Sequence, residues 1–178
     1  MATDPIEQLV LEHRVVEAIL ATIEQELGGT ASVPTPEALA IIRSRVDHLW
    51  VEFYHHSLQR EERLLFPRLG DLAPPGTGPV AVMEQEHRLM VEDFNTILTP
   101  SSDVAEVSRA AATLCATLRL HMIKENTILF PMAREALTRD QQRGLAEQFA
   151  DYDSALGSSP PTAPRCALLR EQQAPKVG

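Results

Sequence analysis

The sequence predicts an all-α fold, an up-down-up-down four-helix bundle with a short additional C-terminal helix and a disordered tail. Apolar residues recur in alternating steps of three and four along four long segments, which is the spacing of amphipathic helices. Capping residues, prolines and glycines separate these segments. Aromatic residues make up only 4% of a chain that is 44% hydrophobic, which suits aliphatic helix packing better than a sheet core.

The first predicted helix begins at Asp4-Pro5, where a capping residue precedes a proline, and ends at Gly28-Gly29. Its apolar face includes one histidine. The inward positions are Ile6, Leu9, His13, Val16, Leu20, Ile23 and Leu27.

The second predicted helix runs from Thr35-Pro36 to about Gly70. Its apolar stripe also reaches a histidine, and it resumes after that histidine with a one-residue slip in register. The inward positions are Ile42, Val46, Leu49, Phe53, His56, Glu61, Leu64 and Arg68.

The third predicted helix begins near Pro79 and ends before Pro100, and the fourth opens with the capping pattern that starts at Asp103. In both helices the polar members of the inward stripe are histidines or a glutamate. These stripes are Val80, Met83, His87, Met90, Phe94 and Ile97 in the third helix, and Val107, Ala111, Leu114, Leu118, His121, Glu125 and Ile128 in the fourth.

A fifth, shorter helix is expected from about Arg139 to Asp153, after the cap-like Thr138. From Gly157 onward the sequence is rich in serine and proline and lacks periodicity, which is typical of disorder. We therefore expect a bundle domain over residues 1–156 and a disordered tail over residues 157–178.

The two halves of the predicted bundle repeat one another. Glu-His-Arg stands at 12–14 and again at 86–88, each time on the first helix of a pair, and Leu-Phe-Pro stands at 65–67 and 129–131, on the second helix. A carboxylate precedes each of these prolines by six residues. It is Glu61 in one half and Glu125 in the other. The chain thus reads as a duplicated helix pair.

Histidines and glutamates on these inward faces indicate a metal site. His121 and Glu125 are four residues apart, so both side chains leave the helix in nearly the same direction. Burying several imidazoles and two carboxylates without a partner would cost several kcal/mol for each ionised group, and a cation removes that cost. The candidate ligands are His13, His56, Glu61, His87, His121 and Glu125. Imidazole and carboxylate together suit iron, manganese or zinc.

On these motifs, over about residues 5 to 135, the sequence resembles the hemerythrin-like family of His-His-Glu cation-binding bundles. The resemblance implies a non-heme, oxo- or hydroxo-bridged centre of two iron ions, with manganese or zinc as alternatives. Its implied ligand is dioxygen, peroxide or nitric oxide.

One departure from the repeat concerns the second helix. His56 and Glu61 are five residues apart, and in a regular helix this separation leaves the two side chains roughly 140° apart. A single π-bulge between them would restore the alignment, and the slip in the apolar stripe supports one. His55 and Glu62 remain alternative ligands on this helix.

A second departure concerns ligand number. The oxygen carriers of the family have a fifth histidine four residues after the third-helix one, where this chain has Val91. An open position on one metal favours chemistry or sensing over oxygen storage. We expect the glutamates of both Glu-His-Arg triplets on a solvated face, with orientation of a ligating imidazole by Glu12 or Glu86 as the alternative.

The predicted function is therefore a di-iron protein that binds or reacts with a small oxygen or nitrogen species. Catalase-like or ferroxidase activity is the enzymatic form, and a non-catalytic metal- or oxygen-sensing module is the alternative. A helical bundle without metal is the simplest competing interpretation. The sequence offers no nucleophile triad or organic-cofactor motif.

Charge and composition exclude other classes of partner. With 16 Lys and Arg against 25 Asp and Glu, the formal net charge is −9, and no basic cluster suits a nucleic acid. No window has the roughly 18 uncharged residues of a membrane span, and no signal peptide is recognisable, so we expect a cytoplasmic protein. No motif identifies a protein partner.

Overall fold

The structure, a computed structural model, describes residues 4–28, 34–100 and 102–157, apart from the side chains of His55, His56, Asp71 and Leu156. Within these ranges the fold is all-helical, as predicted, and contains no strand. The predicted disorder of residues 158–178 lies outside the described residues.

The first helix, α1, spans Pro5–Leu27, in agreement with the sequence prediction. The side chain of Asp4 caps it by accepting hydrogen bonds from the backbone N–H groups of Ile6, at 2.8 Å, and Glu7, at 3.2 Å. Gly28 ends it in the left-handed conformation, with φ of 68°, which glycine adopts without steric cost.

The second predicted helix is a helical path whose winding changes several times. It begins with α2, Pro36–Trp50, and continues as the π-helix η1, Val51–Leu58. A second π-helix, η2, spans Glu61–Leu65 and leads into the short α3, Phe66–Leu69, and the 3₁₀ turn η3, Gly70–Leu72. The predicted change in winding is present, and it extends over more residues than the single bulge that the sequence predicted.

The second half of the chain repeats this plan. Helix α4 spans Gly78–Leu98, and α5 spans Val104–Lys124. A π-helix, η4, continues α5 over Glu125–Leu129 and leads into α6, Phe130–Ala136. The four-residue spacing of His121 and Glu125 did not predict η4. The last described helix, α7, covers Arg139–Gly157 and confirms the predicted fifth helix.

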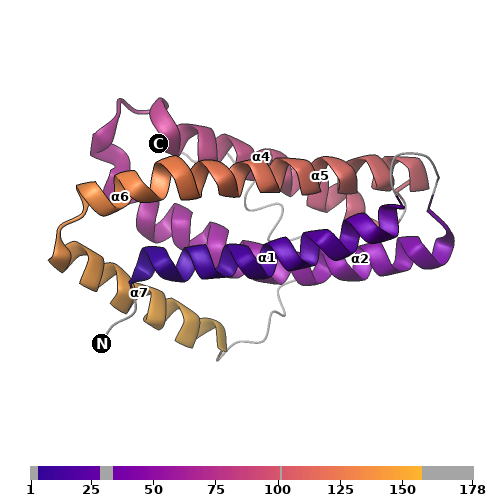
Figure 1. Ribbon diagram of the computed structural model, residues 1–178, viewed down its shortest axis with the longest axis horizontal. Helices are drawn as coiled ribbons and strands as arrows, with labels where there is room; N and C mark the ends of the chain where they lie inside the picture. The colour runs from indigo at the N-terminus through magenta and orange to yellow at the C-terminus, as the bar shows by residue number, and fades with distance from the viewer. Residues whose placement is uncertain (1–3, 29–33, 101, 158–178) are drawn as a thin grey trace.

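Helices α1, α2, α4 and α5 run beside one another along the long axis of the molecule (Figure 1). Helix α1 packs against α2 and α5, and α4 packs against α5 and α2. Helix α7 crosses below the start of α1 in Figure 1 and contacts α1 and η2. It therefore covers the part of the molecule where the second helical path is π-helical.

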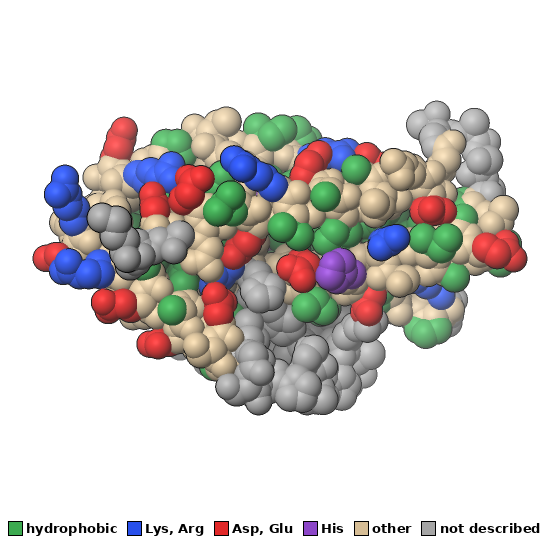
Figure 2. Space-filling model, turned by 60° about the horizontal axis from the view of Figure 1, so that its bottom comes forward, with side chains coloured by type: hydrophobic (Ala, Val, Ile, Leu, Met, Phe, Trp, Pro, Cys, Tyr) green, Lys and Arg blue, Asp and Glu red, His purple; other side chains and the backbone are tan. Residues whose placement is uncertain are grey.

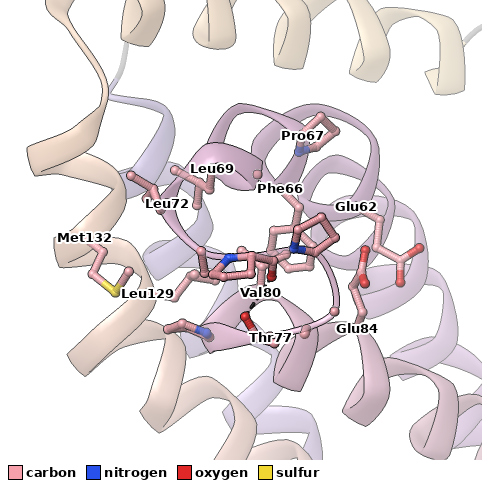
Figure 3. Close-up of a pocket in the computed structure, with 17 residues that line it drawn as sticks. Glu62, Phe66, Pro67, Leu69, Leu72, Thr77, Val80, Glu84, Leu129 and Met132 are labelled. Atoms are coloured by element: carbon pink, nitrogen blue, oxygen red, sulfur yellow. Dashed lines mark hydrogen bonds between the residues drawn. The ribbon is translucent and has the colours of Figure 1, made fainter.

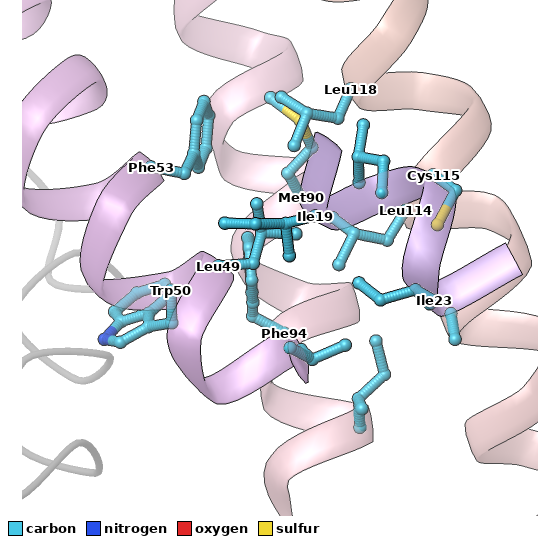
Figure 4. Close-up of a cluster of buried hydrophobic side chains, with 14 of the residues drawn as sticks. Ile19, Ile23, Leu49, Trp50, Phe53, Met90, Phe94, Leu114, Cys115 and Leu118 are labelled. Atoms are coloured by element: carbon cyan, nitrogen blue, oxygen red, sulfur yellow. The ribbon is translucent and has the colours of Figure 1, made fainter. Parts of the chain in front are cut away.

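Two apolar clusters form the core. The larger one, drawn in part in Figure 4, packs α1, α2, η1, α4 and α5 together around Trp50, Phe53 and Phe94. The smaller one joins the start of α1 to η2, α3, α6 and α7. On α1, Leu9 belongs to the smaller cluster and Val16 to the larger, so the buried His13 lies between them. A polar layer thus separates two apolar ones.

The surface carries charges of both signs. Figure 2 shows acidic and basic side chains interspersed with apolar ones over one face of the molecule. None of the helices in the described ranges is both long enough and apolar enough to cross a membrane.

Candidate metal centre

Four side chains from four elements meet in the polar layer. Each of Glu61 on η2, His87 on α4, His121 on α5 and Glu125 on η4 offers one ligand atom, and these atoms all lie within 4.8 Å of one another. All four side chains are fully buried. All four residues were predicted from the sequence as candidate ligands.

The contacts between them are close. His87 Nε2 lies 3.0 Å from His121 Nε2 and 3.5 Å from Glu61 Oε2. His121 Nε2 lies 3.3 Å from Glu125 Oε1, as expected for residues four apart on one helical path. Nitrogen and oxygen ligand atoms thus converge on one point of the core.

His13 joins this group from α1. Its Nε2 atom lies 3.3 Å from Glu125 Oε2, and the side chain is 4% exposed. The side chain of His56, the remaining predicted ligand, lies outside the described residues, as does that of the alternative His55. Its backbone lies in η1. The structure brings together the side chains of His13, Glu61, His87, His121 and Glu125. The ligand role of these five residues and of His56 stays a prediction.

The buried carboxylates lie close to imidazole nitrogens but make no well-formed hydrogen bond. Neither oxygen of Glu61 or Glu125 accepts a hydrogen bond within the described part of the chain, and His13 Nε2 makes none there either. Leaving ionised groups buried and unsatisfied costs several kcal/mol each. A divalent or trivalent cation among these atoms would satisfy them, and imidazole nitrogen with carboxylate oxygen is a donor set that iron, manganese and zinc accept. The residues therefore fit a metal ion.

The pKa values of the centre reflect how its buried charges act on one another. Burial, and then the neighbouring Glu125, raise the pKa of Glu61 above its usual range. Burial opposes the charged form of His87, but the nearby carboxylates of Glu61 and Glu62 outweigh it and raise the pKa of His87 to about 9. Burial likewise opposes ionisation of Glu125, but His121 and His13 hold its pKa well below the usual range. Without metal, protons on imidazole take the place of the cation.

An outer set of residues holds the outer nitrogen of each imidazole. His87 Nδ1 lies 3.1 Å from Glu62 Oε1, and His121 Nδ1 lies 3.0 Å from Glu86 Oε2. Such contacts fix the orientation of the ring and turn Nε2 toward the centre. The contact between Glu86 and His121 agrees with the alternative interpretation of the sequence, in which Glu86 orients an imidazole. Glu62, the alternative ligand, contacts His87 through Nδ1, the nitrogen that faces away from the centre.

Two outer contacts were not foreseen from the sequence. His13 Nδ1 lies 3.1 Å from Asn126 Oδ1, and Lys124 forms an ion pair with Glu86. Both new residues flank Glu125, so adjacency to a predicted ligand is the one signal that could have identified them. Glu12, the other suggested orienting residue, instead pairs with the fully buried Arg60.

The fold also explains the missing fifth histidine. Val91 is 2% exposed and belongs to the larger apolar cluster. A valine side chain cannot donate to a metal, so this position adds no nitrogen to the imidazoles described around the centre.

Comparisons with known proteins point to one domain family. The family model for the hemerythrin HHE cation-binding domain matches residues 4–133, a range that includes every predicted ligand and ends before α7. Uncharacterized proteins of Mycobacterium bovis and Mycobacterium tuberculosis are 28% identical to the chain over 161 residues. The match covers 83% of this chain and 60% of each relative. No solved structure gives a significant match.

Proposed function

This chain belongs to the hemerythrin HHE cation-binding family, and from that premise we propose that it is a non-heme di-iron protein. Its metal centre binds or reacts with a small oxygen or nitrogen species such as dioxygen, peroxide or nitric oxide. The observation that carries the proposal is the convergence of the buried carboxylates of Glu61 and Glu125, whose oxygens accept no hydrogen bond in the described part of the chain, with imidazole nitrogens. Two carboxylates between two similar helix pairs favour two metal ions over one.

The proposed architecture is an up-down-up-down four-helix bundle of α1, α2 with its continuation, α4, and α5 with its continuation. The cycle of contacts from α1 to α2, α4, α5 and back to α1 supports it. Such a bundle gives both halves of the repeat the same access to the polar layer.

In the proposed centre, the imidazoles of His13, His56, His87 and His121 and the carboxylates of Glu61 and Glu125 would hold the metal ions. The metal supplies redox chemistry and a Lewis-acidic position for the small ligand. The protein holds the imidazole rings in place through Glu62, Glu86 and Asn126.

The reaction is tested with iron-loaded protein exposed in turn to dioxygen, hydrogen peroxide and nitric oxide. Visible absorption reports binding, and an oxygen electrode reports peroxide turnover against the same concentration of free iron. Turnover above free iron, lost in Glu125→Ala and kept in the exposed His48→Ala control, would identify an oxidoreductase. A reversible absorption change without turnover would identify a carrier or sensor. No response to any of the three species would contradict the proposal.

A further inference from the structure

A cavity lies beside the candidate metal centre, on the side of His87 that faces away from the centre. It has a volume of about 320 Å³, within the range of small-molecule sites. Its walls come from η2, α3, the turn before α4, the start of α4, and the η4–α6 segment (Figure 3). Most of the lining is apolar, including Phe66, Val80, Leu129 and Met132.

Two carboxylates mark one end of this cavity. Glu62 and Glu84 both line it, and Figure 3 shows them at the same end. Glu62 contacts His87 through one oxygen, while Glu84 makes no ion pair within the described ranges of the chain. An apolar wall with paired acidic groups at one end complements a molecule that has a hydrocarbon body and a positively charged head.

Two of the lining residues also touch His87. Glu62 Oε1 lies 3.1 Å from His87 Nδ1. The ring of Phe66 stacks on the imidazole, with centroids 5.8 Å apart and planes inclined by 13°. A molecule in the cavity would therefore contact both groups that hold the outer side of this imidazole.

We propose that this cavity binds a small organic amine in its ammonium form, with the ammonium group between Glu62 and Glu84 and the hydrocarbon part against Phe66 and Val80. The amine competes with His87 for Glu62 and so alters the metal centre through the outer nitrogen of a ligand. This second effect rests on the proposed function, whereas the binding itself does not.

The binding is tested by isothermal titration calorimetry, in which the full chain is titrated with 2-phenylethylamine. Its neutral analogue 2-phenylethanol has nearly the same shape and serves as the ligand control. We expect saturable binding of the amine and at least tenfold weaker binding of the alcohol, because only the amine offers a charge to the two carboxylates. Equal affinities, or no saturable binding of the amine, would overturn the proposal.

Two variants locate the site. Glu84→Gln keeps the size of the side chain and removes its charge, so amine binding should weaken about tenfold. Ala81→Leu adds bulk to the lining and should abolish it. Glu92→Gln, an exposed change on the same helix, is the matched control and should bind as the parent does. Unchanged affinity in both Glu84→Gln and Ala81→Leu would overturn the proposal.

The effect on the centre is measured by the visible absorption of cobalt(II)-loaded protein during the same titration. The cobalt bands should shift in the parent and not in Glu62→Gln, which removes the shared carboxylate. Failure of the chain to take up cobalt would count against the proposed metal function, and the calorimetric titration would still decide whether the cavity binds amines. Bands that stay unchanged while the amine binds would refute the coupling.

Discussion

Glu61 and Glu125 place two carboxylates in one buried layer, and the free energy of the metal-free protein must include their repulsion. Because burial and Glu125 raise the pKa of Glu61, the ionised form of Glu61 destabilises the folded state above its usual pKa. Glu61→Gln should therefore stabilise the metal-free protein at pH 7, by about 1–2 kcal/mol, while it lowers metal content.

Urea unfolding of chelator-treated protein measures this stability, and metal analysis of the untreated protein measures the loss of binding. The exposed Glu135→Gln is the control and should change neither quantity. A Glu61→Gln variant that is destabilised without metal would show that the carboxylate has a stabilising partner in the apo protein.

His87 predicts that metal binding releases protons. Its pKa in the metal-free protein is about 9, so it is protonated at pH 7.5 and must lose that proton to bind a metal through nitrogen. Since a raised folded-state pKa stabilises the protonated form, His87 contributes stability to the apo protein below pH 6.5 and loses it as pH rises through about 9.

Calorimetric titration with iron(II) or cobalt(II) in two buffers of different ionisation enthalpy counts the protons. We expect release of at least about one proton per chain at pH 7.5 and an affinity that increases with pH up to about 9. Identical heats in the two buffers would show that His87 is neutral before the metal binds.

At the level of single residues, the sequence identified the inward side chains of the centre and missed most of those around it. His13, His87 and His121 interrupt apolar stripes, which is visible in one helix at a time. Asn126 and Lys124 each contact a side chain on another helix, His13 on α1 and Glu86 on α4, and neither belongs to an apolar stripe. Their roles depend on how neighbouring helices are rotated, and no single-helix pattern contains that information.

Among the elements, some of the π-helical segments could be predicted from the sequence and one could not. The five-residue step from His56 to Glu61 and the slip in the apolar stripe indicated a change of winding there, and η1 and η2 contain it. In the other half, the four-residue step from His121 to Glu125 fits a regular helix, yet η4 begins at Glu125. Because η4 starts at Glu125, it leaves the spacing between His121 and Glu125 unchanged, so this spacing could not indicate a π-helix.

Helix α7 is fixed to the core through Arg60, the residue next to Glu61. The guanidinium is fully buried and contacts Glu12 on α1 and Asp153 on α7, and it lies 4.8 Å from the centre of the Phe149 ring. Burying an arginine is favourable only with its partners in place. Asp153→Asn should therefore cost about 1 kcal/mol of unfolding free energy, and Phe149→Ala about 3 kcal/mol through the lost apolar contact as well.

Thermal or urea unfolding measures both changes. Arg143→Ala, at a position on α7 whose side chain is 63% exposed, is the control and should leave stability unchanged. If Phe149→Ala unfolded like the parent, α7 would be an independent appendage, although it contacts α1 and η2.

For the whole molecule, we expect stability to depend on metal, because the polar layer between the two apolar clusters buries carboxylates that a cation would satisfy. A ligand bound only to the folded state at 1,000 times its dissociation constant stabilises it by about 4 kcal/mol. We expect chelation to lower the melting temperature by on the order of 10 °C and re-addition of iron to restore it. An unchanged melting temperature in protein shown to lose its metal would contradict this role of the layer.

The all-helical class and the starts of the long helices were predicted from capping residues and periodicity, because these signals are local. The position of α7 against Arg60 was not, because an arginine in a helical stripe normally indicates a solvated face. The cytoplasmic location, the oxygen or nitrogen ligand and the number of metal ions stay predictions.

The most direct test of the central claim is the metal content per chain of protein purified without chelator, with its visible absorption spectrum, in the parent, His121→Ala and His48→Ala. His121 is buried in the centre and His48 is exposed, so the two variants remove the same side chain from different places. We predict about two iron ions per chain and iron charge-transfer absorption in the parent and His48→Ala, both lost in His121→Ala. A folded parent without metal, or a His121→Ala variant with the content and spectrum of the parent, would contradict the account.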